Sequence, residues 1–339
     1  MPDPESPRAQ LVQMAMAHWV SRLVFTAAHL NLADHLADGP RTTAELGQLT
    51  STDAPSLYRV MRTLASLGLF TEDSTHRFSL TPLGEALKTG TAGSVRASVL
   101  TLAGDHFTKA QEQLTYSIRT GKSGFEKAFG VPLFEWLKNH PAEAAMFNDT
   151  MVGLHGAEPV AVAAAYDFSG FETITDVGGS TGNLLTTILG RFPKPRGILF
   201  DLPHVVRDAP ALIQSRGLSD RINIEAGSFF EHVPTGSDAY MLSHIIHDWT
   251  ETQCLTILGN CRRAMKPGAR LLIIEMVLAA GDAPHPGKML DIIMLTIPGG
   301  RERTEHEYRE LLEKAGFRLT RVVPTQSAVS IVEALPQVS

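Results

Sequence analysis

The sequence predicts an α/β protein in which a doubly wound, mainly parallel sheet domain follows a mainly helical, winged-helix module. Three observations support this fold class. A β-prone run at residues 174–176 passes through a glycine cluster into an apolar helical pattern. After Ala165, strand-like and helix-like hydrophobic runs alternate, as they do in doubly wound sheets. Before Gly90, short helical patterns are followed by a hairpin pattern.

Length and composition indicate a globular protein with small-molecule partners. The chain has 339 residues, 43% of them hydrophobic and 19% charged, and a net charge of −6. That length suffices for two domains, and the charge gives no general reason to bind nucleic acid or an anionic membrane. The first residues are acidic and lack a signal-peptide pattern, and no apolar run reaches the roughly 20 residues of a membrane span. We therefore expect a cytoplasmic protein.

The two cysteines, Cys254 and Cys261, fall seven apart in one helical pattern. Seven helical residues rise about 10.5 Å, which exceeds the roughly 7 Å limit between the Cα atoms of a disulfide. The pattern predicts core thiols in a reducing compartment.

Residues 10–37 show a helical pattern with a wide apolar stripe that includes Leu11, Met14 and Trp19. The stripe is broader than the first helix of a monomer usually needs. Burial against a second subunit explains it, and packing on its own domain is the alternative.

Residues 42–80 read as a winged helix. A short helix is followed by a second one capped by Asp53 and ended by Gly68, and then by strands at residues 69–71 and 77–80. Such modules often bind DNA. However, residues 38–90 hold five basic and six acidic side chains, whereas a DNA-reading face should be basic. The balance disfavours a DNA-binding regulator.

Residues 91–165 read as mostly helical. Phe147 and Met151 lie four apart in this region, on one helix face. They are interpreted either as core residues or as the wall of a pocket for a flat, apolar substrate.

The glycine cluster predicts a tight turn between a strand and a helix N-terminus, where the backbone can approach a ligand closely. A dinucleotide-binding fingerprint would need glycines at 178, 180 and 183, but Ser180 and Asn183 occupy two of these positions. The run Asp-Val-Gly-Gly-Ser-Thr-Gly from Asp176 to Gly182 instead resembles the first motif of S-adenosylmethionine (SAM) methyltransferases.

The following strands end in further candidate side chains. Residues 197–200 lead to Asp201, an acid placed to accept hydrogen bonds from a ribose. The run 227–230, Gly-Ser-Phe-Phe, lies where an adenine could rest on an aromatic ring. The strand at 239–243 runs directly into His244 and His247.

His247 is the sharpest catalytic candidate. It comes just after a strand end, where open α/β sheets bind ligands, and imidazole suits proton abstraction near neutral pH. The alternative is a histidine that orders its loop, with Asp248 and Glu251 capping the next helix. Glu275, after the strand 270–274, is expected to orient the imidazole. His244 and His247 lack a third ligand at a recognisable spacing, so no metal is expected.

The last elements are a helical face at residues 289–295, a capping box from Thr304 to Glu307, and two edge strands near 318–323 and 328–334.

Taken together, these motifs resemble the caffeic-acid and hydroxyindole type of SAM-dependent O-methyltransferase, in its bacterial secondary-metabolism branch. The resemblance covers nearly the whole chain. It rests on the winged-helix module and on the runs 176–179, 200–203, 227–230, 247–249 and 298–304.

The resemblance implies a Rossmann-like SAM-binding domain at residues 166–339, a dimerisation domain at 1–95 and a helical linker and pocket region at 96–165. It also implies a homodimer and a small aromatic substrate, and no metal.

The resemblance further implies roles for single residues of this chain. Gly178 and Gly182 would hold the methionine moiety, Asp201 the ribose, and Ser228, Phe229 and Ser243 the adenine. His247 would be the general base, held by Glu275 and Glu302, and the substrate would contact Phe147, Met151, His244, Met294 and Ile297.

Three positions depart from the family pattern. Ser180 replaces a glycine, and Ser228 and Ser243 stand where plant members often carry an acid and a lysine. These changes bear on the adenine and carboxylate contacts, not on the fold.

The expected reaction is transfer of the SAM methyl group to a phenolic or polyketide-like hydroxyl. Three alternatives stay open: a SAM-sensing winged-helix regulator, a noncatalytic partner subunit, and a diverged member that carries out C-methylation, decarboxylation or hydroxylation. The retained histidine argues against the diverged relatives that have lost this base.

Overall fold

The computed structural model describes residues 6–337, which divide into two compact units. One unit comprises the chain up to Lys109 together with Glu135–Leu154, and the other comprises Ala110–Phe134 and the chain from His155 onward. The domain limits that the sequence suggests, 1–95, 96–165 and 166–339, stay predictions. Within the described part of the chain, no helix combines the length and apolar character needed to cross a membrane.

The first unit contains a small antiparallel sheet, in the order β1-β3-β2, beside the helices α3 and α4. Helix α4 begins at the cap that the sequence predicts, since the Asp53 carboxylate accepts the N–H of Ser56 at 2.9 Å. Helix α3 begins at a capping box of Thr42 and Glu45, which the sequence analysis did not predict. The elements of this unit are α1 (Pro7–His29), α2 (Leu32–His35), β1 (Arg41–Thr42), α3 (Thr43–Thr50), α4 (Ala54–Ser66), β2 (Phe70–Glu72), β3 (Arg77–Leu80), α5 (Pro82–Glu85), α6 (Arg96–Leu102), and most of α7 (Asp105–Gln111), α10 (Leu133–Lys138) and α11 (Pro141–His155).

The first helix is shorter than the single helix expected over residues 10–37. Helix α1 ends at His29, and Asn31 takes a left-handed backbone conformation with φ of 52° before α2 begins. Asparagine tolerates this conformation better than most residues, so it breaks the helix although the apolar periodicity continues.

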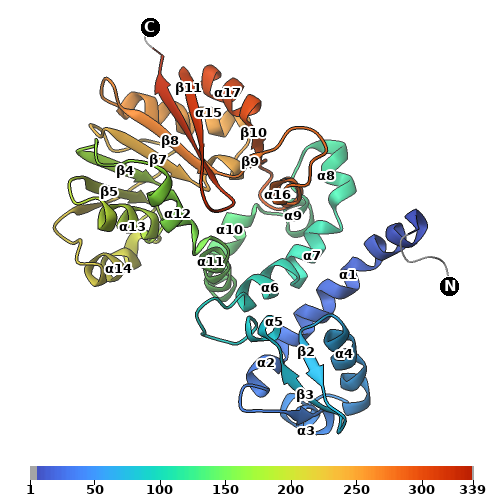
Figure 1. Ribbon diagram of the computed structural model, residues 1–339. Coiled ribbons are helices and arrows are strands. Elements are labelled where there is room, and N and C mark those ends of the chain that lie inside the picture. The colour runs from blue at the N-terminus through green and yellow to red at the C-terminus, as the bar shows by residue number, and fades with distance from the viewer. Residues whose placement is uncertain (1–5, 338–339) are drawn as a thin grey trace. The chain divides into compact units, whose positions relative to one another are not determined.

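The second unit is built on a seven-stranded sheet in the order β11-β12-β8-β7-β4-β5-β6 (Figure 1). The strands from β4 to β8 pair in parallel, and β12 and β11 add an antiparallel edge. The fold class predicted from the sequence is confirmed. The strands of the sheet are β4 (Thr173–Val177), β5 (Arg196–Asp201), β6 (Ile222–Ala226), β7 (Ala239–Ser243), β8 (Arg270–Glu275), β11 (Phe317–Pro324) and β12 (Ser330–Pro336).

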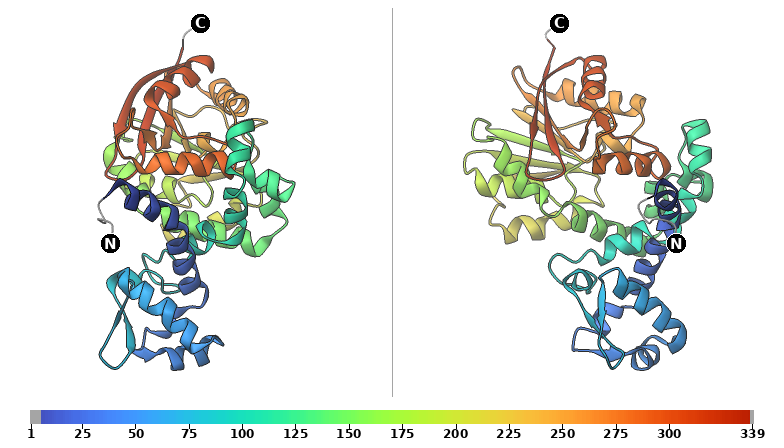
Figure 2. Two further views of the ribbon diagram at one scale, coloured as in Figure 1. Left: turned by 90° about the vertical axis from the view of Figure 1, so that its right-hand side faces the viewer. Right: turned by 45° about the vertical axis from the view of Figure 1, so that its right-hand side comes forward.

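Helices cover both faces of this sheet, as Figure 2 shows from two sides. Successive residues of β8 alternate: Leu272 and Ile274 pack with α12, α13 and α14, whereas Leu271 and Ile273 pack with α15 and α17. The other elements of the unit are α8 (Leu114–Thr120), α9 (Gly124–Phe129), α12 (Glu158–Ala165), α13 (Asn183–Arg191), η1 (Val206–Asp208), α14 (Ala209–Ser215), η2 (Ile246–Asp248), α15 (Glu251–Ala264), β9 (Val277–Leu278), α16 (Pro286–Thr296), β10 (Arg303–Thr304) and α17 (Glu305–Lys314).

The parallel pairing places the carboxyl ends of β4, β5, β7 and β8 along one edge of the sheet. The candidate residues that follow these strands therefore gather at the same edge, as expected for an open α/β sheet.

Candidate active site

The glycine-rich turn after β4 needs its glycines for both conformation and space. Gly178 has a φ of 74°, and a Cβ there would lie 2.4 Å from Cδ1 of Ile245. Gly182 has a φ of 86° and stands at the N-cap of α13. Ser180, in place of the family's glycine, also has a positive φ, of 54°. The turn thus brings bare backbone to the edge of the sheet beside Ile245.

Asp201 ends β5 and holds this turn from the side. Its Oδ2 accepts the N–H of Ser180 at 2.9 Å, and its Oδ1 accepts the N–H of Leu202 at 2.7 Å. Burial raises the pKa of Asp201. Each carboxylate oxygen retains the capacity to accept a further bond, as a ribose diol requires.

Asp176 is a buried acid whose two carboxylate oxygens have no partner among the described residues. Burial, followed by the charge of Asp201, raises its pKa to about 7. In the sequence, Asp176 serves only to mark the motif. The structure adds it to the site as a buried acceptor that is unsatisfied by the protein.

One of the predicted adenine residues, Phe229, belongs to an aromatic cluster. The rings of Phe229 and Phe230 lie 4.9 Å apart, and each also meets Trp249 edge to face. The Phe229 carbonyl accepts the side-chain amide of Asn260 at 2.7 Å, which fixes the loop. Ser228 precedes this cluster, and the half-buried Ser243 closes β7.

His247 lies in the short helix η2, just beyond β7, and is buried. Its Nδ1 is 2.7 Å from Oε1 of the buried Glu302, and its Nε2 is 3.6 Å from Oδ1 of Asp248. The structure therefore brings together His247 and Glu302, as predicted, and adds Asp248 beside the opposite nitrogen.

Glu275 acts differently from the sequence-based expectation, in which it oriented the imidazole. Its Oε1 accepts the backbone N–H groups of Ile245 and His247, each at 3.1 Å, and the Tyr308 hydroxyl donates to its Oε2. Glu275 thus holds the backbone that carries the histidine. Tyr308, 33 residues away in the sequence, could not be connected to it from the sequence alone.

The protonation of His247 follows from its neighbours. Burial lowers the pKa of the imidazole, but Asp248, Glu302 and Glu275 outweigh it and raise the pKa to about 10. Burial also raises the pKa of Asp248, to about 6. His247 is therefore a much stronger base than an unperturbed imidazole.

Asp248 is not part of a helix cap, contrary to one reading of the sequence. Helix α15 is capped by Thr250, whose hydroxyl accepts the N–H of Gln253 while the Gln253 side chain accepts from Thr250. Asp248 is left to face His247, and Glu251 is the first residue of the helix.

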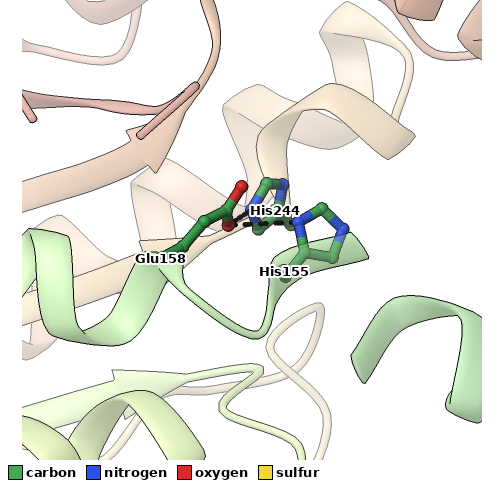
Figure 3. Close-up of side chains that lie close together, drawn as sticks. All are labelled: His155, Glu158 and His244. Atoms are coloured by element: carbon green, nitrogen blue, oxygen red, sulfur yellow. Dashed lines mark hydrogen bonds and ion pairs between the residues drawn. The ribbon is translucent and has the colours of Figure 1, made fainter. Parts of the chain in front are cut away.

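His155, Glu158 and His244 form a second polar cluster (Figure 3), and its His244 lies near His247. Oε2 of Glu158 is 2.7 Å from Nε2 of His244 and 3.1 Å from Nδ1 of His155. The rings of His244 and His247 are 5.4 Å apart. Only His244 was singled out by the sequence, because His155 and Glu158 precede it by more than 80 residues.

Two groups of donors meet the distance requirement for one metal ion: His155, Glu158 and His244, and His247, Glu275 and Glu302, with ligand atoms within 4.8 Å in each group. His244 and His247, the pair that the sequence suggested, fall in different groups. In both groups the carboxylates already accept hydrogen bonds from imidazole, backbone or phenol groups.

The predicted substrate residues fall in both units. Met294 is half-buried on α16 and Ile297, just after it, is buried, both in the unit that holds His247. Phe147 and Met151 are half-buried on α11, in the other unit. Their roles as pocket residues stay predictions.

Comparisons with known proteins agree across the chain. The family model of the O-methyltransferase domain matches residues 111–318, and that of the O-methyltransferase dimerisation domain matches residues 12–90. A phenazine O-methyltransferase of Lysobacter antibioticus is 42% identical over 96% of this chain and 95% of its own. A 3-amino-4-hydroxybenzoate 4-O-methyltransferase of Streptomyces cremeus is 39% identical over 94% of this chain and 87% of its own.

Solved structures show the same likeness. An O-methyltransferase from neocarzinostatin biosynthesis, in complex with SAM and 2-hydroxy-5-methyl naphthoic acid, superposes with a TM-score of 0.82. It is 34% identical and covers 94% of this chain and 96% of its own. The resemblance stated from the sequence is confirmed: the chain belongs to the O-methyltransferase family.

Proposed function

We propose that this enzyme transfers the methyl group of SAM to a hydroxyl of a small aromatic acceptor, with His247 as the general base. The observation that carries the proposal is the His247–Glu302 pair, joined at 2.7 Å at the sheet edge that also holds the glycine-rich turn. The likeness to the family indicates the reaction class. The His247–Glu302 pair would provide the proton acceptor that the reaction needs.

The residues after β4 and β5 fit SAM. Gly178 keeps space where any side chain would strike Ile245, and Asp201 offers acceptor capacity for a ribose. The unpartnered carboxylate of Asp176 suits a ligand that brings positive charge and N–H donors. When bound, SAM supplies a methyl group on a positively charged sulfur, which the acceptor oxygen takes in one displacement.

The raised pKa of His247 suits a phenolic acceptor. A phenol has a pKa of about 10, and the three carboxylates raise the pKa of His247 to about 10 as well. Proton transfer between groups of matched pKa is nearly balanced in free energy. Glu302 holds Nδ1, so that Nε2 is the atom that takes the proton.

The acceptor class follows from the relatives. They carry the names of enzymes for a phenazine, an aminohydroxybenzoate and a naphthoic acid, all flat and aromatic. We extend to this chain only the class that they share, a small hydroxylated aromatic of secondary metabolism. The half-buried apolar side chain of Met294, in the unit that holds His247, agrees with it.

We also propose that the enzyme is a homodimer, built on the dimerisation domain that the family model identifies. The first half of α1 exposes large apolar side chains that a monomer would leave in water, with Met14 72% and Trp19 61% exposed.

The buried free thiols Cys254 and Cys261 agree with the cytoplasmic location expected above, which stays a prediction.

The test is a turnover assay with SAM and a panel of phenols, hydroxynaphthoates and hydroxyphenazines, read by mass spectrometry. We expect one methyl gained on oxygen, and a 10²- to 10⁴-fold fall in kcat in the His247→Ala variant. The matched control is His306→Ala, since His306 is an exposed histidine on α17.

Two outcomes would count against the proposal. Methylation on nitrogen or carbon would show a different acceptor atom. Wild-type turnover in His247→Ala, with SAM bound normally, would show that the base lies elsewhere.

A further inference from the structure

The cluster of His155, Glu158 and His244 has a defined pattern of donors and acceptors. Glu158 is buried at the first turn of α12, and its Oε2 meets a ring nitrogen of each histidine. Burial opposes ionisation, but hydrogen bonds from the two imidazoles hold the pKa of Glu158 down, at about 2. The carboxylate is therefore ionised at neutral pH and can only accept hydrogen bonds.

This fixes the tautomer of His244. Its Nε2 lies 2.7 Å from the Glu158 carboxylate, so Nε2 carries the hydrogen. Burial lowers the pKa of His244, which keeps the ring neutral. A neutral imidazole has a single N–H, so Nδ1 must carry a lone pair. The second nitrogen of His244 is thus an acceptor that faces away from Glu158 (Figure 3).

That acceptor is buried and has no hydrogen-bond partner among the described residues. A buried acceptor that is left unsatisfied destabilises the folded protein, because it has lost its hydrogen bonds to water. The fold nevertheless constrains the ring: the His155 ring lies against it, with the ring centroids 3.9 Å apart and the planes tilted by 42°, and the His244 backbone is in the left-handed region with φ of 53°. A left-handed conformation is unfavourable for a residue with a side chain, and an unsatisfied acceptor held in this way is typical of a ligand-binding position.

The ligand at this position would share the site with His247, since the two rings are 5.4 Å apart. One imidazole takes the proton of the reacting hydroxyl, and the other offers an acceptor a short distance away. We propose that Nδ1 of His244 accepts a hydrogen bond from a second hydroxyl or amino group of the acceptor, next to the hydroxyl that is methylated. This assignment rests on the proposed function and names the substrate class: catechols, 2-aminophenols and their fused-ring counterparts.

The test compares acceptors that differ only in this donor. 3-Amino-4-hydroxybenzoate and 3,4-dihydroxybenzoate carry the donor, whereas 4-hydroxybenzoate and 3-methoxy-4-hydroxybenzoate do not. For the wild-type enzyme we expect kcat/KM to favour the donor compounds by about 5- to 100-fold, the equivalent of one buried hydrogen bond. In His244→Leu this ratio should collapse toward one.

The donor-to-non-donor ratio of kcat/KM in the wild type is divided by the same ratio in His244→Leu. This removes the intrinsic reactivity of each phenol, because that reactivity is the same for both enzymes. His306→Leu serves as the control variant and should keep the wild-type ratio. An equal loss on all four compounds in His244→Leu would mean that His244 only supports the fold, and the proposal would be overturned.

A second measurement does not need turnover. Long-range ¹H–¹⁵N correlation spectra of the labelled enzyme should show His244 as the Nε2–H tautomer, and catechol should shift the Nδ1 resonance whereas anisole should not. The Nδ1–H tautomer would overturn the proposal. The proposal would also be overturned if the wild-type enzyme held one equivalent of tightly bound zinc that His244→Leu lost. A metal ion binds Nε2 through its lone pair, and Nε2 has no free lone pair when it carries the hydrogen.

The two proposals fail in different ways. If no acceptor is methylated but catechol still shifts Nδ1, the proposed reaction is at fault. If phenols are methylated without regard to the neighbouring donor, only the role of His244 is wrong.

Discussion

Nδ1 of His247 lies 2.7 Å from Oε1 of Glu302, and both side chains are buried. A carboxylate at this nitrogen raises the pKa of the imidazole and leaves Nε2 as the atom that exchanges a proton with the acceptor. Since only the unprotonated Nε2 can accept, the rate should rise with pH until His247 has lost its proton.

The first prediction concerns Glu302→Gln. The amide oxygen still accepts from Nδ1, but one negative charge that raises the pKa of His247 is gone. The rising limb of kcat/KM against pH should therefore move to lower pH, and the plateau should fall because the base is weaker. The measurement is a pH–rate profile that extends from pH 6 to at least one unit above the pKa of about 10.

Glu305→Gln is the control for that profile, because Glu305 is exposed on α17 and pairs with the neighbouring Arg309. Its profile should match that of the wild type. If Glu302→Gln leaves the limb in place, Glu302 does not set the pKa of the base.

The second prediction concerns Gly178→Ala. The added Cβ would lie 2.4 Å from Cδ1 of Ile245, at a φ of 74°. Overpacking of this kind costs about 1–3 kcal/mol, so we expect SAM to bind about 5- to 100-fold more weakly by calorimetry. Gly217→Ala is the matched control, because Gly217 has a similar φ of 67° but open space around its Cα. An equal loss in both variants would mean that backbone strain alone matters.

The third prediction concerns Asp176→Asn. The folded protein raises the pKa of Asp176 to about 7, against about 3.9 in the unfolded chain. The stability that its proton contributes is complete below pH 4 and is lost as the pH rises through 7. The amide cannot ionise, so the SAM-free variant should be more stable than the wild type at pH 8 but should bind SAM more weakly.

Thermal unfolding at pH 5 and pH 8, with and without SAM, checks both parts. Asp220→Asn, at an exposed aspartate, controls for the loss of one charge. Undiminished SAM binding in Asp176→Asn would remove Asp176 from the cofactor site.

The sequence predicted the second unit well because its signals are local. A run of consecutive apolar residues marks β8 as a strand that is buried on both faces, and capping pairs such as Thr304 and Glu307 fix where helices begin. The positions of Asp201, His247 and Glu275 at strand ends followed from the same patterns, since parallel strands end at one edge.

What the sequence could not predict depends on contacts between distant residues. No short-range sequence pattern links Glu158 to His244 or Tyr308 to Glu275. The hydrophobic periodicity also cannot show that Glu275 accepts backbone N–H groups instead of contacting the imidazole. The break at Asn31 was missed for another reason: the apolar stripe continues through it, so the pattern hides a local backbone preference.

The last prediction concerns the dimer. Helix α1 exposes six large apolar side chains on all sides of its first turns: Leu11, Val12, Met14, Met16, Trp19 and Val20. A single domain surface can cover only one side of a helix, so exposure on several sides favours insertion into a partner subunit. Met14→Glu with Trp19→Glu should therefore convert a dimer into monomers, as measured by light scattering on a sizing column. Val160→Glu, at a similarly exposed apolar residue of α12, should stay dimeric. A monomeric wild type would mean that this helix packs on its own chain, whereas a double variant that stays dimeric would place the interface elsewhere in the protein.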